Sequence, residues 1–218
     1  MTDSTAAPRT HRAMREESDR RIIEAAIEAF ADRGYHRTTL NQIGRSAGFT
    51  GALISTRYGS KAGLVREVLL HILGRLTPID WDPASGETWI DPERGGAEQL
   101  GEFVDAYIAD AVDQPTRLRA LYVLIGESLG GMDEIDGEVA LVNRVFRDHV
   151  AAHIRLGQSR REFRSEIDPD DAAVLIVGTL RGVVTQLLME PDSLDPAVVA
   201  GELRRGVIMP LVRDERAG

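Results

Sequence analysis

The apolar residues of this chain recur at helical spacing along most of its length. Between Ser18 and Arg33 they fall on one side of a helix, and charged residues occupy another side. No stretch alternates apolar and polar residues as a strand would. Further helical patterns cover residues 97–113, 116–129, 134–158, 169–189 and 196–213. The sequence therefore predicts an all-α protein.

Two short helices are expected in the segment 39–58. Thr39 and Gln42 have the spacing of a capping box, and Gly48 is placed to end the helix that they begin. Thr50 can then cap a second short helix. Two short helices joined by a tight turn, behind a longer one, are the pattern of a helix-turn-helix.

A longer helix is expected from Ser60 to about Leu76. A connection rich in Pro, Gly and Asp follows at residues 77–96 and contains Trp81 and Trp89. We therefore expect three parts, which are a flexible basic arm over 1–17, a helix-turn-helix domain over 18–64, and a larger helical domain over 65–218.

Charge is divided unevenly between these parts. The whole chain has a formal net charge of −9. Residues 1–61 hold ten basic and seven acidic residues, which gives them +3 and leaves −12 for the remainder. A basic module on an acidic body is typical of a protein that brings one part to a polyanion. Acidic residues that merely keep a large domain in solution would explain the −12 but not the +3.

Several short motifs occur in order between Arg21 and Leu64. They are Ala26 and Phe30 in one helix, Gly34-Tyr35, Thr38-Thr39, Ile43, Ala47-Gly48 and Gly59-Ser60-Lys61. In this combination the segment resembles the DNA-binding domain of the TetR family of bacterial transcriptional regulators. The resemblance implies that residues 18–64 form a DNA-binding domain and that residues 65–218 form an all-helical effector-binding and dimerisation domain. Two positions depart from the family, because Ser55 replaces a usual phosphate-binding aromatic residue, often Tyr, and Gly44 stands where Ala is common.

The helix after Thr50 would be the recognition helix. Ile54 and Tyr58 take its inward positions, so the other positions face the major groove. Ala52 and Leu53 suit thymine methyl groups. The predicted DNA-binding residues are Thr39, Asn41, Thr50, Gly51, Ala52, Leu53, Ser55, Thr56, Arg57 and Lys61.

Some of these assignments have alternatives. Asn41 could contact a base or a phosphate, or be merely a solvated polar residue. Arg57 could replace the phosphate contact that Ser55 cannot make. Arg9, Arg12 and Arg15 form an arm that either reaches a minor groove or is an idle tail.

Lys61 is the one lysine among 26 basic residues. It stands at the start of a helix, where backbone N–H groups and the helix dipole already attract phosphate. The resemblance implies that Lys61 clamps the DNA backbone. A lysine without such surroundings would be interpreted as a solvated surface residue.

An effector pocket is expected among the helices between residues 97 and 158. The candidate lining residues would serve equally well as core. The helix that begins at Ser60 joins Lys61 to the effector domain, so a ligand that displaces its far end would move the DNA-reading module. We expect a small, largely apolar inducer that releases DNA. The predicted ligand-binding residues are Phe103, Tyr107, Tyr122, Met132, Phe146 and His149.

The helix over 169–189 is apolar nearly all round, which demands burial on more than one side. Gly178 and Gly182, four residues apart, allow another helix to approach closely. A core helix inside a monomer would show the same pattern. The resemblance favours the other interpretation, which is a homodimer that associates through residues 168–213.

Other classes of function find little support. The chain has no cysteine, which excludes disulfide, zinc–cysteine and thiol chemistry. His149 and His153 have the spacing of a metal pair but no third ligand, so we predict no metal and no cofactor. The sequence shows no phosphate loop and no acid–base constellation, so we predict that it is not an enzyme. With neither a signal peptide nor a membrane span evident, we expect a cytoplasmic protein.

Two functions remain. The favoured one is a ligand-responsive DNA-binding regulator, a repressor that a small molecule releases from a palindromic operator. The alternative is a small-molecule-binding or interaction protein whose DNA-reading surface has decayed, and Ser55 is its main support.

Overall fold

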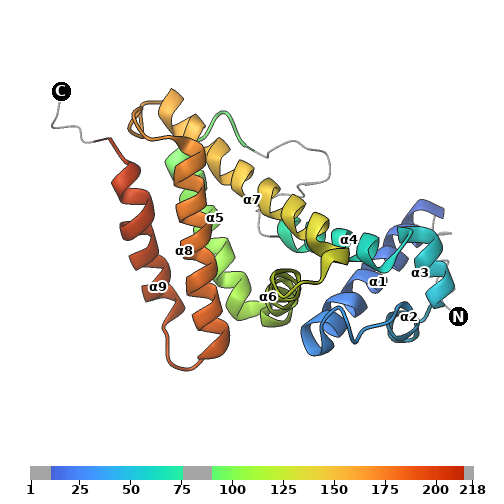
Figure 1. Cartoon of the computed structure of the whole chain (residues 1–218). Helices are drawn as coiled ribbons and strands as arrows, with labels where there is room; N and C mark the ends of the chain where they lie inside the picture. The colour runs from blue at the N-terminus through green and yellow to red at the C-terminus, as the bar shows by residue number, and fades with distance from the viewer. Residues whose placement is uncertain (1–10, 76–89, 214–218) are drawn as a thin grey trace, which may run out of the picture.

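The computed structural model describes residues 11–75 and 90–213 and confirms the all-α prediction. Helices α1–α3 form one end of the molecule, α8 and α9 lie side by side at the other, and α4 and α7 lie between them (Figure 1). The helices are α1 (His11–Arg33), α2 (Leu40–Ala47), α3 (Gly51–Tyr58), α4 (Lys61–Gly74), α5 (Gly96–Asp113), α6 (Pro115–Leu129), α7 (Asp133–Ser159), α8 (Pro169–Met189) and α9 (Pro196–Leu203).

Four predicted helix starts, at Thr39, Thr50, Ser60 and Asp168, are confirmed by their caps. The Thr39 hydroxyl accepts a hydrogen bond from the Gln42 backbone amide, and the Gln42 side-chain oxygen accepts one from the Thr39 backbone amide. These two bonds complete the capping box. The Thr50 and Ser60 hydroxyls accept hydrogen bonds from the Leu53 and Gly63 backbone amides, and so cap α3 and α4 without a reciprocal bond. Asp168 caps α8 through two amides. Each cap satisfies amides that would otherwise lack a partner, and so fixes where each helix begins.

The predicted flexible arm is wrong for the part of it that the structure describes. Helix α1 begins at His11 rather than at Ser18, so residues 11–17 are helical. Arg12 and Glu16 form an ion pair of 2.7 Å at i,i+4 spacing, which supports the extra turns. Arg9 lies outside the described residues.

The end of the chain also differs from the expectation of one helix over 196–213. Helix α9 stops at Leu203 and is followed by a π turn over residues 204–208 and a 3₁₀ turn over residues 209–211. Pro210 has no amide hydrogen to donate, so a regular helix cannot continue through it. The Arg164 amide donates to the Leu211 carbonyl at 2.9 Å, which ties this end to the loop before α8.

Helix α4 joins the two ends of the molecule. It packs against α1 on one side and α7 on the other, and the domain boundary expected at residue 64 falls inside it. Residues 77–89 of the expected connection, which hold Trp81 and Trp89, lie outside the described residues, and residues 90–96 lead into α5. The buried side chains of α4 are Leu64, Val65, Val68, Leu69, Leu70, Ile72 and Leu73.

Within the described residues, α8 is long and apolar enough to cross a membrane by length and composition alone. Its packing gives another explanation for this composition. Ala173, Ile176 and Leu180 are buried on one side of α8, which packs against α5 and α7. The opposite side carries exposed apolar residues, among them Leu175 and Met189.

Candidate nucleic-acid interface

Helix α3 shows the two faces expected of a recognition helix. Ile54 is fully buried and anchors the helix to the module beneath it. Four of the predicted base-reading residues are exposed on the outer side, and Leu53 is 36% exposed. These four are Ala52, Leu53, Ser55 and Thr56.

Gly51 is not part of that outer face, so only its backbone could contact DNA, and that contact stays a prediction. The residue is buried, and a Cβ atom there would overlap the Asn41 side chain of α2. Asn41 itself remains exposed at the start of α2. Gly51 therefore allows α2 and α3 to approach each other closely and has no side chain to offer DNA.

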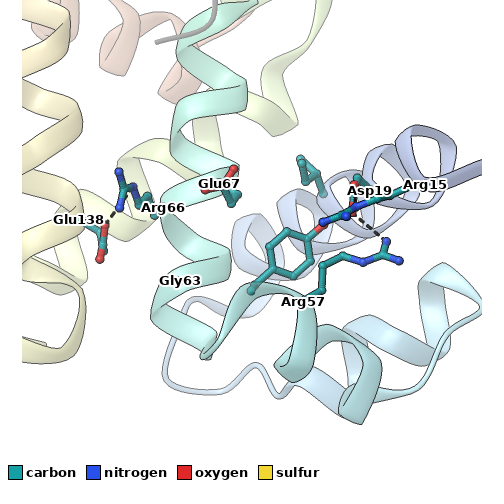
Figure 2. Close-up of a pocket in the computed structure, with 9 residues that line it drawn as sticks. Arg15, Asp19, Arg57, Gly63, Arg66, Glu67 and Glu138 are labelled. Atoms are coloured by element: carbon teal, nitrogen blue, oxygen red, sulfur yellow. Dashed lines mark hydrogen bonds and ion pairs between the residues drawn. The ribbon is translucent and has the colours of Figure 1, made fainter. Parts of the chain in front are cut away.

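Arg57 is held inside the module, so the predicted replacement phosphate contact is not available in this structure. One nitrogen, Nη1, donates to Asp19 at 2.8 Å and to the Ser18 hydroxyl at 2.7 Å. The Arg57 side chain is only 18% exposed. Figure 2 shows this pair on one side of a pocket of about 430 Å³, with Arg66 of α4 directed the other way toward Glu138.

Asp19 also fixes the end of the recognition helix. The Tyr58 hydroxyl donates to Asp19 at 2.9 Å. Burial and this bond raise the pKa of Tyr58 above its ordinary value, so the hydroxyl keeps the proton that it donates. Asp19 of α1 thus receives bonds from two consecutive residues of α3 and sets the angle at which α3 is presented.

Lys61 has an internal role that the sequence did not reveal. Its Nζ donates to the carbonyls of Tyr35 and Thr38 at 2.9 and 3.0 Å and lies 3.8 Å from the centre of the Tyr35 ring. Burial lowers the pKa of Lys61, while Glu134 and Glu127 act in the opposite direction. An ammonium has three N–H donors and these hydrogen bonds use two of them, so the backbone clamp stays a prediction.

Two arginines beside α3 were missed. Arg45 is exposed on α2, one helical turn beyond Asn41, and the i,i+4 spacing of the two residues could have revealed it. Arg21 of α1 lies 5.2 Å from the centre of the Phe49 ring, in the turn between α2 and α3. No local sequence pattern predicts that Arg21 lies beside this turn, because tertiary packing brings it there.

Comparison with known proteins places this geometry in a family. Residues 22–68 match the family profile described as bacterial regulatory proteins, tetR family, and residues 92–207 match the C-terminal profile of BetI-type transcriptional repressors. The chain belongs to the TetR family. It is a ligand-responsive, DNA-binding transcriptional regulator, as its matches are regulators rather than enzymes.

Similar TetR-family proteins cover most of the chain. The HTH-type transcriptional regulator TtgR of Pseudomonas putida is 29% identical over 182 residues, which are 83% of this chain and 84% of that protein. SrpR of Pseudomonas putida is 27% identical over 175 residues, 80% of this chain and 75% of that protein. The structure of NalD from Pseudomonas aeruginosa shares the fold with a TM-score of 0.65 at 21% identity, covering 91% of this chain and 98% of that one.

The predicted ligand-binding residues of this TetR-family chain are mostly brought together. Phe103 lies 5.4 Å from Phe146 and 5.2 Å from His149, measured between ring centres. The hydroxyls of Tyr107 and Tyr122 are 2.8 Å apart. The cluster spans α5, α6 and α7 and packs against itself, so a lining role for these residues remains a prediction.

Met132 does not join this cluster, and its predicted role in ligand binding stays a prediction. It is the residue that precedes α7. Phe146 follows it much farther along the same helix, at a distance of about 21 Å for a rise of 1.5 Å per residue. Met132 therefore lies far along α7 from the aromatic cluster that contains Phe146.

Proposed function

We propose that this TetR-family protein is a homodimeric repressor that binds a palindromic operator through α3 and is released by a small, largely apolar molecule. The observation that carries the proposal is the outer face of α3. One leucine and three small side chains, two of them polar, project there from a helix that is anchored by Ile54 and capped by Thr50. Such a face fits the floor of a major groove, which argues against a decayed reading surface.

The outer side of α8 supports dimerisation through residues 168–213. A Cβ atom at Gly178 or Gly182 would meet no atom within 4 Å, so another helix can approach there. Leu175 and Met189 on the same helix are 71% and 76% exposed. Exposed apolar side chains around small residues suit a helix–helix interface.

A dimer also satisfies the demands of DNA binding. Two recognition helices must lie about 34 Å apart to enter successive major grooves on one face of DNA. One short helix alone buries too little surface for a specific site. In Figure 1, α8 and α9 lie opposite α2 and α3, so pairing there leaves both reading modules free.

The names of relatives support a small-molecule effector. The A-factor receptor protein of Streptomyces griseus is 25% identical over 175 residues, 80% of this chain and 55% of that protein. The NalD structure is titled as the secondary repressor of a multidrug efflux pump. By analogy, we place the effector among α5, α6 and α7 in this chain. Helix α4 would carry its effect to the DNA-binding module. We propose that the protein acts in the cytoplasm.

Selection of bound duplexes from a random DNA pool tests the proposal. The purified protein should enrich a palindrome with half-sites about one helical turn apart. Thr56→Ala or Leu53→Ala should change the preferred bases, because both side chains are exposed on α3. If no duplex is enriched at moderate salt, the proposal fails and the small-molecule-binding alternative takes its place.

A further inference from the structure

The turn between α1 and α2 is held by two carboxylates that follow it by more than 90 residues in the chain. The Tyr35 and His36 amides donate to the Glu127 carboxylate at 2.5 and 3.3 Å. The Tyr35 hydroxyl donates to Glu134 at 2.7 Å. Glu127 lies in the last turn of α6 and Glu134 in the first turn of α7. The corner between these helices therefore grips the DNA-binding module directly.

The conformation of the turn leaves room for the Glu127 carboxylate. Gly34 has φ of +74°, and a Cβ atom there would lie 2.6 Å from a Glu127 carboxylate oxygen. Any other residue would be strained at this φ and would push the carboxylate away. Tyr35 is 2% exposed. The close fit indicates a specific contact and not a chance meeting of surface groups.

The opposite side of the same turn is held by α4. Lys61, the first residue of α4, donates to the Tyr35 and Thr38 carbonyls. The turn that leads into α2 is thus fixed from two directions, by the α6–α7 corner and by α4. We call the contacts of Glu127 and Glu134 with residues 34–36 the carboxylate clasp.

We propose that Glu127 and Glu134 are positioning residues for operator binding, because the carboxylate clasp carries movements of the α6–α7 corner into α2. This inference rests on the proposed function and adds a second connection beside α4. Charge-assisted hydrogen bonds are directional and stronger than neutral ones, so they fix an orientation where apolar contacts allow sliding. Gly131 in the corner has φ of +92°, which makes the corner itself a place where the chain turns sharply.

A distance measurement tests the clasp without DNA or ligand. The chain has no native cysteine, so Ser46→Cys on α2 and Ala140→Cys on α7 can carry two spin labels at exposed positions. Labelled chains are diluted with unlabelled protein so that distances within one chain dominate. In this background, Glu127→Ala should at least double the width of the distance distribution, and Glu127→Gln, which keeps one acceptor oxygen, should widen it less.

Asp133→Ala is the matched control, because Asp133 is an exposed carboxylate in the same corner. It removes the same charge but should leave the width unchanged. Equal widths for Glu127→Ala and Asp133→Ala would overturn the proposal. If Glu127→Ala does not fold, Tyr35→Phe replaces it, because this variant removes the bond to Glu134 alone and must still widen the distribution.

Hydrogen exchange then tests transmission with the duplex recovered by selection. Binding of this duplex should slow exchange in residues 126–136 of the wild type and of Asp133→Ala. In Glu127→Ala the slowing there should be lost while slowing in α3 persists. Slowing in both regions of Glu127→Ala would overturn the proposal. A protein that binds no duplex would contradict the proposed function. The spin-label distances would still test the carboxylate clasp, because they are measured without DNA.

Discussion

Lys61 shows how one side chain can serve both stability and DNA binding. Two of its N–H groups are bound to the Tyr35 and Thr38 carbonyls. We predict that Lys61→Ala lowers the free energy of unfolding by about 1–3 kcal/mol, since it removes charged hydrogen bonds from a partly buried turn. If the third N–H reaches phosphate, the salt dependence of DNA binding should also become less steep by about one unit.

Denaturant unfolding and salt titration of operator affinity separate these two roles. Arg119→Ala is the control, because Arg119 is an exposed basic residue on α6, away from α2 and α3. Arg119→Ala changes the total charge by the same amount as Lys61→Ala. It should alter neither the free energy of unfolding nor the salt dependence of operator affinity. A Lys61→Ala protein with lower stability but an unchanged salt slope would leave Lys61 a purely structural residue.

His149 should make the stability depend on pH. Its side chain is 1% exposed, and burial followed by the nearby His153 lowers the pKa of His149 to about 3. Below pH ~6.5 the unfolded chain takes up a proton at this residue while the folded chain does not. The unfolded state then binds more protons, so stability falls as the pH falls from about 6.5 toward 3.

Because of His149, the free energy of unfolding should fall by about 2–3 kcal/mol between pH 6.5 and pH 4.5, at 1.36 kcal/mol per unit. Thermal or urea unfolding at several pH values measures it. His149→Phe should flatten the curve in this window, whereas replacement of the exposed His36 by Gln should not. Parallel curves for wild type and His149→Phe would show that His149 is not the source.

At the scale of the element, the helix-turn-helix depends on the closeness of α2 and α3. A Cβ atom on Gly44 would lie 2.7 Å from the Phe49 carbonyl oxygen, which is backbone and cannot rotate away. We predict that Gly44→Ala destabilises the protein by about 1–3 kcal/mol through overpacking. It should also weaken binding to the selected operator more than binding to random duplex, because α3 would be displaced.

Gly137→Ala is the matched control for that change. Gly137 lies in α7, where a Cβ atom would meet no other atom within 4 Å, and substitution there should stabilise the helix by up to about 1 kcal/mol. Unfolding curves and the ratio of the two DNA affinities give the comparison. Equal stability of Gly44→Ala and wild type would mean that the turn adjusts without cost.

The elements were largely predictable from the sequence because local signals define them. The caps at Thr39, Thr50 and Asp168 depend on residues two or three positions apart. The site was less predictable because its decisive contacts are tertiary. Arg57 is hydrogen-bonded to Asp19, 38 residues away in the sequence, and Tyr35 to Glu134, 99 residues away. No helical periodicity or short motif records such partners.

At the scale of the whole molecule, the open side of α8 should determine the oligomeric state. We predict that Gly182→Arg gives folded monomers that bind the operator weakly, because a long charged side chain would stand in the proposed interface. Sedimentation at micromolar concentration, together with circular dichroism, distinguishes loss of pairing from loss of folding. Gly137→Arg, also in open space but on α7, should remain dimeric.

A wild-type protein that sediments as a monomer at that concentration would contradict the interface on α8. A Gly182→Arg protein that stays dimeric would do the same. Weak operator binding by a monomer would follow from geometry, since the two recognition helices would no longer be held about 34 Å apart.

The position of Lys61 also makes the chain easy to divide. A protease that cuts after lysine has one target in the whole sequence, and it separates residues 1–61 from residues 62–218. The target peptide bond lies in the first turn of α4, beside a side chain held by two carbonyls. Cleavage must therefore wait until this junction opens. The rate at which two fragments appear would report how often the DNA-reading module comes loose from the rest of the protein.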